Sequence, residues 1–271
     1  MAEATDRPVT LRNEMLGTPA VPMEEFDELT EIRRSAGKSV CKITTSEGNI
    51  GTGALYQVSG ALYSNTNRFL ILTCNHVLPI ISNSELTHVN LQFKDIQEMA
   101  SINLDKQQVL FAWTTKILDA TVIEISVEMA RMFLSKGAQF LKVGTLHESL
   151  PNIKIVMLQY PSGKYSIAHG DIENIEGSNV FYRIGTAPGS SGSPLLSLDG
   201  KALAMHNAGP NNPGITGDNP NAERKAIVLS SVIDAYLKEF PNNEQVADLQ
   251  SQVTILQYIK YCKFLRFNFI F

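Results

Sequence analysis

The chain has 271 residues, of which 44% are hydrophobic and 18% are charged, so it can bury a sizeable core and has the balance of an ordinary globular protein. Its formal net charge is −4 at pH 7. This charge excludes a basic face over the whole surface, and we therefore expect no nucleic-acid partner.

The N-terminal segment, residues 1–37, is polar and contains three prolines before it becomes rich in charge. It has no apolar run of the kind found in a secretory signal. The spacing of its last part would allow a short amphipathic helix, but we expect residues 1–37 to form a mobile extension. The three cysteines have no paired spacing and predict free thiols; they are Cys41, Cys74 and Cys262. Together, the missing signal and the free thiols predict an intracellular protein.

Residues 38–126 have the rhythm of an antiparallel β-barrel. Short β-branched or aromatic runs alternate with stretches that contain glycine or asparagine. These runs are residues 39–44, 53–58, 68–73, 89–93, 109–113 and 120–125. We therefore expect them to form one barrel.

Two residues at the ends of these runs are candidates for acid–base chemistry. His76 follows the buried run 69–72, and Asp119 stands at the entry of the run 120–125. A histidine at the end of a buried strand is held rigidly, and an acid can orient it and stabilise its imidazolium. Cys74 is expected to be a small buried residue, with a metal ligand or redox sensor as the alternative.

Residues 127–137 have helical spacing and end on glycine, which predicts the connection to a second barrel over residues 138–230. Strand-like runs in this part cover residues 154–160, 180–184 and 202–207. A loop rich in Gly, Pro and Asn follows. Residues 224–240 predict a strand that passes into a helix ending before Pro241.

The tail, residues 241–271, has the spacing of a narrow helical seam and then an aromatic, basic end. This end is too short and too interrupted by charges to span a bilayer. Attachment to a membrane surface is the alternative to an unusual or disordered terminus.

The stretch 185–194, here called the nucleophile loop, is typical of a loop that carries a reactive serine. A serine hydroxyl needs a base to take its proton and donors aimed at the oxyanion that forms. Gly189 and Gly192 flank Ser191 and permit a tight turn, in which the amides of Gly189 and Ser191 point at one spot. A surface turn is the alternative, because Gly, Ser and Pro clusters mark loops in any protein.

The order histidine, aspartate, serine is one that a catalytic triad takes. The motifs around these residues resemble the trypsin-like (chymotrypsin-fold) serine peptidase superfamily. They are Leu72–Val77, Asp119–Ile123 and Gly189–Pro194, together with Gly51–Tyr56, which resembles the glycine-rich first hairpin of that fold. The resemblance implies an all-β fold of two packed six-stranded antiparallel barrels with a C-terminal helix. It implies no cofactor.

Carried over by position, the resemblance makes His76 the general base, Asp119 its orienting partner and Ser191 the nucleophile. The amides of Gly189 and Ser191 would form the oxyanion hole. A protein or peptide would be the substrate, cleaved through an acyl-enzyme. The alternative from another class is a catalytically silent peptide-binding module of the same fold, against which the intact three residues argue.

Two positions depart from the family pattern. Asn75 stands where the family usually has a small residue, and Ser193 stands where it usually has glycine. The second departure also occurs in relatives that resemble glutamyl endopeptidases. The remaining histidines lack the spacing of metal ligands, and we expect no metal site; they are His88, His147 and His169.

Thr186 and His206 stand where the resemblance places the floor and wall of the S1 pocket, which holds the side chain before the scissile bond. Gly185 stands where trypsin-type enzymes carry an acid, so a preference for Lys or Arg is not expected. A threonine hydroxyl and a protonated imidazole both donate to a carboxylate. The pattern predicts cleavage after Glu, with Gln second, and weaker cleavage after Glu as His206 loses its proton. The alternative is a structural His206 beside an apolar pocket.

Overall fold

The computed structural model describes residues 23–60, 64–79, 89–94, 96, 102–104, 109–146, 153–208 and 222–240. Residues 1–22 and 241–271, with Cys262 among them, lie outside the described residues, as do His88 and His147. The chain divides into two compact units after Asp234. Every strand and all the predicted site residues belong to the first unit, and only residues 235–240 of the second are described.

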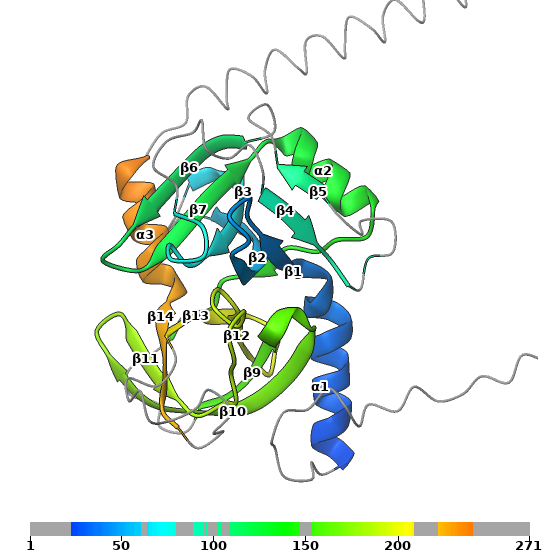
Figure 1. Ribbon diagram of the computed structural model, residues 1–271, viewed down its shortest axis with the longest axis vertical. Helices are drawn as coiled ribbons and strands as arrows, with labels where there is room; N and C mark the ends of the chain where they lie inside the picture. Colours follow the sequence, from blue (N-terminus) through cyan, green and yellow to red (C-terminus); the bar gives the residue numbers. More distant parts are fainter. Residues whose placement is uncertain are drawn as a thin grey trace, which may run out of the picture. The chain divides into compact units, whose positions relative to one another are not determined.

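Two groups of strands form the first unit (Figure 1). The first group, here called the first sheet, is antiparallel in the order β5-β4-β1-β2-β3-β7-β6, and the short β8 pairs in parallel with β2. Its strands are β1 (Val40–Thr44), β2 (Ile50–Gly60), β3 (Ser64–Thr73), β4 (Val89–Gln92), β5 (Ile102–Leu104), β6 (Val109–Thr115), β7 (Ala120–Ile125) and β8 (Leu141–Lys142). All of β7 is buried, which fits its central place between β3 and β6.

The second group, here called the second barrel, is closed in the order β10-β11-β14-β13-β12-β9. Its strands are β9 (Ile153–Gln159), β10 (Ser166–Glu176), β11 (Asn179–Tyr182), β12 (Pro194–Ser197), β13 (Ala202–Ala208) and β14 (Arg224–Val228). Apolar side chains from all six strands meet in one buried cluster that includes Met157, Val180 and Leu195. Closure leaves no unpaired strand edge in this barrel.

The chymotrypsin-like fold predicted from the sequence is confirmed, with one difference in its first half. The second barrel closes with six strands as expected. Within the described residues the first sheet stays open, because β5 and β6 stand at opposite ends of the strand order. The strand β5 has only 3 residues, and β6 has a register shift between Val109 and Phe111, so neither end offers a long regular edge for closure.

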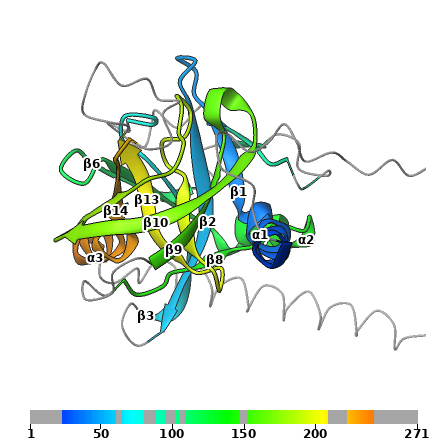
Figure 2. The ribbon, with the colours of Figure 1, turned by 90° about the horizontal axis from the view of Figure 1, so that it is seen from below.

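In the part of the chain that the structure describes, three α-helices accompany the strands. Residues 23–36 of the segment before the first strand are helical rather than a mobile extension. They form α1 (Met23–Ala36), which contacts β9 of the second barrel, buries Leu29 and Ile32 and is seen end-on in Figure 2. The predicted connecting helix is α2 (Val127–Ser135), and the predicted C-terminal helix is α3 (Leu229–Glu239). No described helix is long and apolar enough to cross a membrane.

Candidate active site

His76 lies in the turn that follows β3. The carbonyl of Cys74 accepts a hydrogen bond of 3.2 Å from the amide of Val77 and closes this turn. The amide of Asn75 donates to the carbonyl of Asp119 at 3.2 Å, and the amide of His76 donates to Oδ1 of Asp119 at 3.0 Å. These bonds to backbone amides therefore fix the main chain at His76, without any contact made by the imidazole ring.

Asp119 ends the tight turn between β6 and β7. Its φ of 47° lies in the left-handed region, which aspartate adopts more readily than most residues because its short polar side chain can bond locally. Its amide donates to the carbonyl of Lys116 at 3.3 Å. This turn directs the carboxylate back toward the end of β3, where both of its oxygens find donors on His76.

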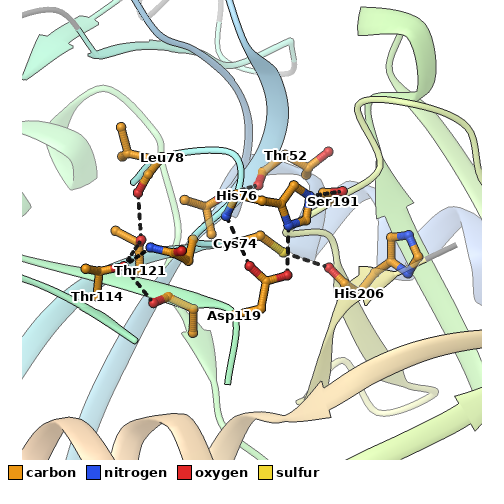
Figure 3. Close-up of polar contacts among 12 residues, drawn as sticks. Thr52, Cys74, His76, Leu78, Thr114, Asp119, Thr121, Ser191 and His206 are labelled. Atoms are coloured by element: carbon orange, nitrogen blue, oxygen red, sulfur yellow. Dashed lines mark hydrogen bonds and ion pairs between the residues drawn. The ribbon is translucent and has the colours of Figure 1, made fainter. Parts of the chain in front are cut away.

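The structure brings together the three side chains predicted for the triad (Figure 3). Nδ1 of His76 lies 2.7 Å from Oδ2 of Asp119, and Nε2 lies 2.8 Å from Oγ of Ser191. An ionised carboxylate only accepts, so Nδ1 carries the proton of the neutral ring. Nε2 then faces the serine hydroxyl as an acceptor, which is the arrangement needed to take its proton.

Two glycines give the nucleophile loop a path that other residues would block. Gly189 and Gly192 have φ values of 99° and 89°. A Cβ on Gly192 would lie 2.0 Å from the carbonyl oxygen of Thr52, and one on Gly189 would lie 2.5 Å from that of Tyr160. Any side chain there would meet both backbone strain and a collision with backbone.

The amides predicted for the oxyanion hole are available. Within the described part of the chain, neither Gly189 nor Ser191 donates a backbone hydrogen bond. The carbonyl of Pro188 accepts from the amide of Ser162, at 2.6 Å, in the short turn η5 (Pro161–Gly163). Because the C=O and N–H of a trans peptide point in opposite directions, this bond turns the Gly189 N–H away from η5.

Thr52 on β2 is not among the site residues predicted from the sequence. Its amide donates to the carbonyl of Ser191 at 2.8 Å. Its hydroxyl donates to the carbonyl of Gly189 at 2.8 Å and accepts from the amide of Tyr160 at 3.0 Å. The first sheet therefore holds the nucleophile loop by the carbonyls of both oxyanion-hole residues. The motif Gly51–Tyr56 contained this residue, but it indicated only a hairpin.

Both departures from the family pattern have structural partners. The side-chain amide of Asn75 donates to the hydroxyl of Thr114 on β6, which bonds Oγ1 of Thr121 on β7 at 3.0 Å. The Ser193 hydroxyl donates to the carbonyl of Ser190 at 2.6 Å. Asn75 therefore ties the histidine turn to the two strands that flank Asp119, and Ser193 closes the turn around the nucleophile.

Cys74 is a buried free thiol beneath the triad, and Cys41 is also buried and free, as predicted. Sγ of Cys74 donates to the carbonyl of His206 at 3.2 Å (Figure 3). Its sulfur and the ligand atoms of His76 and Asp119 lie within 4.8 Å of one another. Burial, and then the charge of Asp119, raise the pKa of this thiol well above its usual range, which disfavours the thiolate that a metal would need.

Thr186 and His206, the predicted pocket residues, are both buried on the side of the second barrel, with exposures of 4% and 3%. Oγ1 of Thr186 accepts a hydrogen bond of 2.7 Å from Nε of Arg224. Arg224 is the first residue of β14 and is 1% exposed. A single arginine at the start of a predicted strand belongs to no motif, so nothing in the sequence indicated this buried cation.

His206 lies in surroundings that disfavour its protonated form. Its Nδ1 shares a hydrogen bond of 2.6 Å with the hydroxyl of Tyr182. Burial, and then the positive charge of Arg224, lower the pKa of His206 to about 3. These surroundings disfavour the protonated imidazole on which the expected carboxylate contact depends, and the role of His206 in the pocket stays a prediction. A second positive charge inside the barrel beside Arg224 is unfavourable.

Comparisons with known proteins identify the family of this chain. Residues 58–205 match the trypsin-like peptidase domain. No curated protein sequence matches the chain. Similar solved structures include an inactive serine-to-alanine mutant of Rv3671c from Mycobacterium tuberculosis, with 15% identity and a TM-score of 0.56 over 83% of this chain and 98% of that one. Another is the HtrA-type protease AlgW with a tripeptide, with 16% identity and a TM-score of 0.53 over 76% of this chain and 61% of that one.

The solved structures are distant in sequence and support the fold. The family match covers more than half of the chain and includes His76, Asp119 and Ser191. The chain therefore belongs to the trypsin-like peptidase domain family and is a serine-type peptidase.

Proposed function

We propose that the chain is an endopeptidase in which Ser191 is the nucleophile, His76 the general base and Asp119 the group that orients the imidazole. The observation that carries this proposal is the unbroken path of two hydrogen bonds, 2.7 Å and 2.8 Å long, from Asp119 through His76 to Ser191. These are distances at which a base accepts a proton without further movement.

The reaction proceeds in two halves. Oγ of Ser191 attacks the scissile carbonyl carbon while Nε2 of His76 takes its proton, and the oxyanion accepts hydrogen bonds from the amides of Gly189 and Ser191. The imidazolium then protonates the leaving amine as the carbon–nitrogen bond breaks. In the second half, His76 takes a proton from water, the hydroxide attacks the ester carbon, and the serine oxygen leaves with the proton returned to it.

We further propose that cleavage follows glutamate, with glutamine second. Gly185 provides no acid for a basic side chain, while the buried Thr186 provides a hydroxyl that donates to either a carboxylate or an amide.

The test compares the purified chain with Ser191→Ala on a peptide library varied at the residue before the cut. We expect cleavage after Glu and then Gln, reduced at least about 10⁴-fold in Ser191→Ala. Ser197→Ala, which changes a serine on β12 outside the triad, is the matched control and should retain cleavage. Equal cleavage by Ser191→Ala and the parent chain would sink the proposal. Peptide binding without cleavage by the parent chain would favour the silent binding module.

A further inference from the structure

Arg224 is the largest of the fully buried side chains among the described residues. Its Nε donates to the hydroxyl of Thr186 at 2.7 Å, and its Nη1 donates to the carbonyl of Ala222 at 3.1 Å. Burial of a guanidinium is costly, and this one is buried in direct contact with Thr186, a predicted pocket residue.

The backbone connects the surroundings of Arg224 directly to the nucleophile loop. The amide of His206 donates to the carbonyl of Ser193 at 2.9 Å, and its carbonyl accepts from the amide of Gly192 at 2.8 Å. In the pairing of β13 with β14, His206 stands opposite Ala226, two residues after Arg224. Arg224 therefore stands on β14, which pairs with β13, the strand whose His206 backbone holds the nucleophile loop.

The donors in this region suit an anionic side chain. The Thr186 hydroxyl accepts from Arg224 and donates to no group within the described part of the chain, so its own proton is available to a ligand. The guanidinium is planar, weakly hydrated and permanently charged, which makes it the preferred partner of carboxylates. The neutral His206 adds no charge of its own.

We propose that Arg224, together with the Thr186 hydroxyl, is the specificity-determining group of this peptidase and selects an ionised glutamate side chain before the scissile bond. This inference rests on the proposed function. It replaces His206 as the source of positive charge and places glutamine clearly below glutamate, because an amide gains much less than a carboxylate from a guanidinium.

A positive charge from arginine rather than histidine makes the preference for Glu over Gln independent of pH. An arginine keeps its proton throughout the pH range in which proteins are studied, and a glutamate side chain is ionised above about pH 5. The ratio of kcat/KM for Glu to that for Gln should therefore stay constant between pH 6 and pH 9. The titratable or charged groups that face His206 are Tyr182, Arg224, Cys74, His76 and Asp119.

The experiment uses the full chain and fluorogenic peptides that differ only in Glu, Gln or Leu before the cut. We expect the parent chain to prefer Glu, and Arg224→Gln to lose about 10- to 100-fold in kcat/KM for Glu while cleavage after Gln and Leu persists. Arg224→Lys, which keeps the charge, should retain part of the preference. Arg183→Gln is the matched control, since Arg183 is a half-exposed arginine of the same barrel that pairs with Glu173, and it should leave the preference unchanged.

Several results would overturn the inference and leave the proposed function standing. These are an undiminished Glu preference in Arg224→Gln, a parent chain that cleaves without preferring Glu, and a Glu-to-Gln ratio that falls as a histidine deprotonates. The last two need no variant, so they decide the question even where Arg224→Gln fails to fold. In contrast, no cleavage of any peptide, together with no labelling of Ser191 by a fluorophosphonate, would mean that the proposed function itself fails.

Discussion

The triad and the predicted pocket differ in their exposure to solvent. The side chains of His76 and Asp119 are 50% and 27% exposed and stand on turns of the first sheet. Thr186, His206 and Arg224 are buried on the side of the second barrel. The first set is fixed largely by backbone hydrogen bonds, whereas the second is fixed by bonds between buried side chains.

Under the proposed function, this difference in exposure assigns catalysis to the exposed residues and substrate recognition to the buried ones. A base that cycles its proton in every turnover must reach both water and substrate, and exposure serves that need. A charge that recognises a carboxylate acts more strongly where water is excluded, because the effective dielectric constant is lower there. We therefore expect changes in the triad to alter turnover without altering specificity, and changes in the pocket to do the reverse.

Replacement of Asp119, the proposed orienting acid, should give the largest loss of turnover without a change in specificity. In Asp119→Asn the side-chain amide no longer holds the Nδ1 proton, so the imidazole can present its proton to Ser191, and kcat should fall about 10⁴-fold. The ratio of kcat/KM for Glu to that for Gln should stay as in the parent chain. The control is Asp199→Asn, in a turn where Asp199 pairs with Lys201 at 2.7 Å, and it should be fully active. A changed ratio in Asp119→Asn would contradict the assignment of turnover and specificity to different residues.

Replacement of Thr52 should give a smaller loss of kcat/KM and leave the preference for Glu over Gln unchanged. Thr52→Val keeps the shape of the side chain but leaves the carbonyl of Gly189 and the amide of Tyr160 without their partner. Each buried unpaired group costs about 1–3 kcal/mol, so a distorted oxyanion hole should lower kcat/KM about 10- to 100-fold for Glu and Gln alike.

The control for Thr52→Val is Glu124→Gln. Glu124 is also buried in the first sheet, and its carboxylate accepts a hydrogen bond of 3.0 Å from Nε of Arg68, away from the nucleophile loop and the histidine turn. Both variants should lose stability in urea unfolding, and Thr52→Val should lose much more activity. Equal losses of activity would indicate that Thr52 acts only through stability.

The grouping of His76, Asp119 and Ser191 was predictable because each of these residues lies in a short local pattern. His76 ends a buried apolar run, Asp119 precedes a β-branched strand, and Ser191 stands between glycines. The order of these motifs also predicted the fold. The open first sheet was not predictable, because whether β5 meets β6 depends on strand lengths and register that the residue pattern does not fix.

The missed residues act through contacts between distant parts of the chain. Thr52 and Gly189 are 137 residues apart, and Arg224 and Thr186 are 38 apart, so no local pattern records either pair. The helix α1 shows the same limit, because the spacing of Leu29 and Ile32 stabilises a helix only where a surface covers them. The lowered pKa of His206 was not predictable either, because it depends on burial and on Arg224, both of which arise only on folding.

The smallest effect concerns the stability of the pocket at acid pH. The pKa of His206 is lowered to about 3 in the folded chain, below the ordinary value of about 6.5 expected when unfolded. The unfolded state therefore binds the extra proton, so the contribution of His206 is fully present above pH 6.5 and is lost as the pH falls toward 3. At pH 5 this loss amounts to about 2 kcal/mol in the free energy of unfolding.

Urea unfolding at pH 7.5 and at pH 5 measures this loss, with Ser191→Ala as the background to prevent self-cleavage. The added change His206→Gln removes the titrating group, so its free energy of unfolding should fall less between the two pH values, by the same amount of about 2 kcal/mol. An equal fall in both proteins would place an ordinary, accessible histidine at this position. The predicted pocket would then be as exposed to solvent as the triad, and the difference in exposure between the proposed catalytic and recognition residues would be lost.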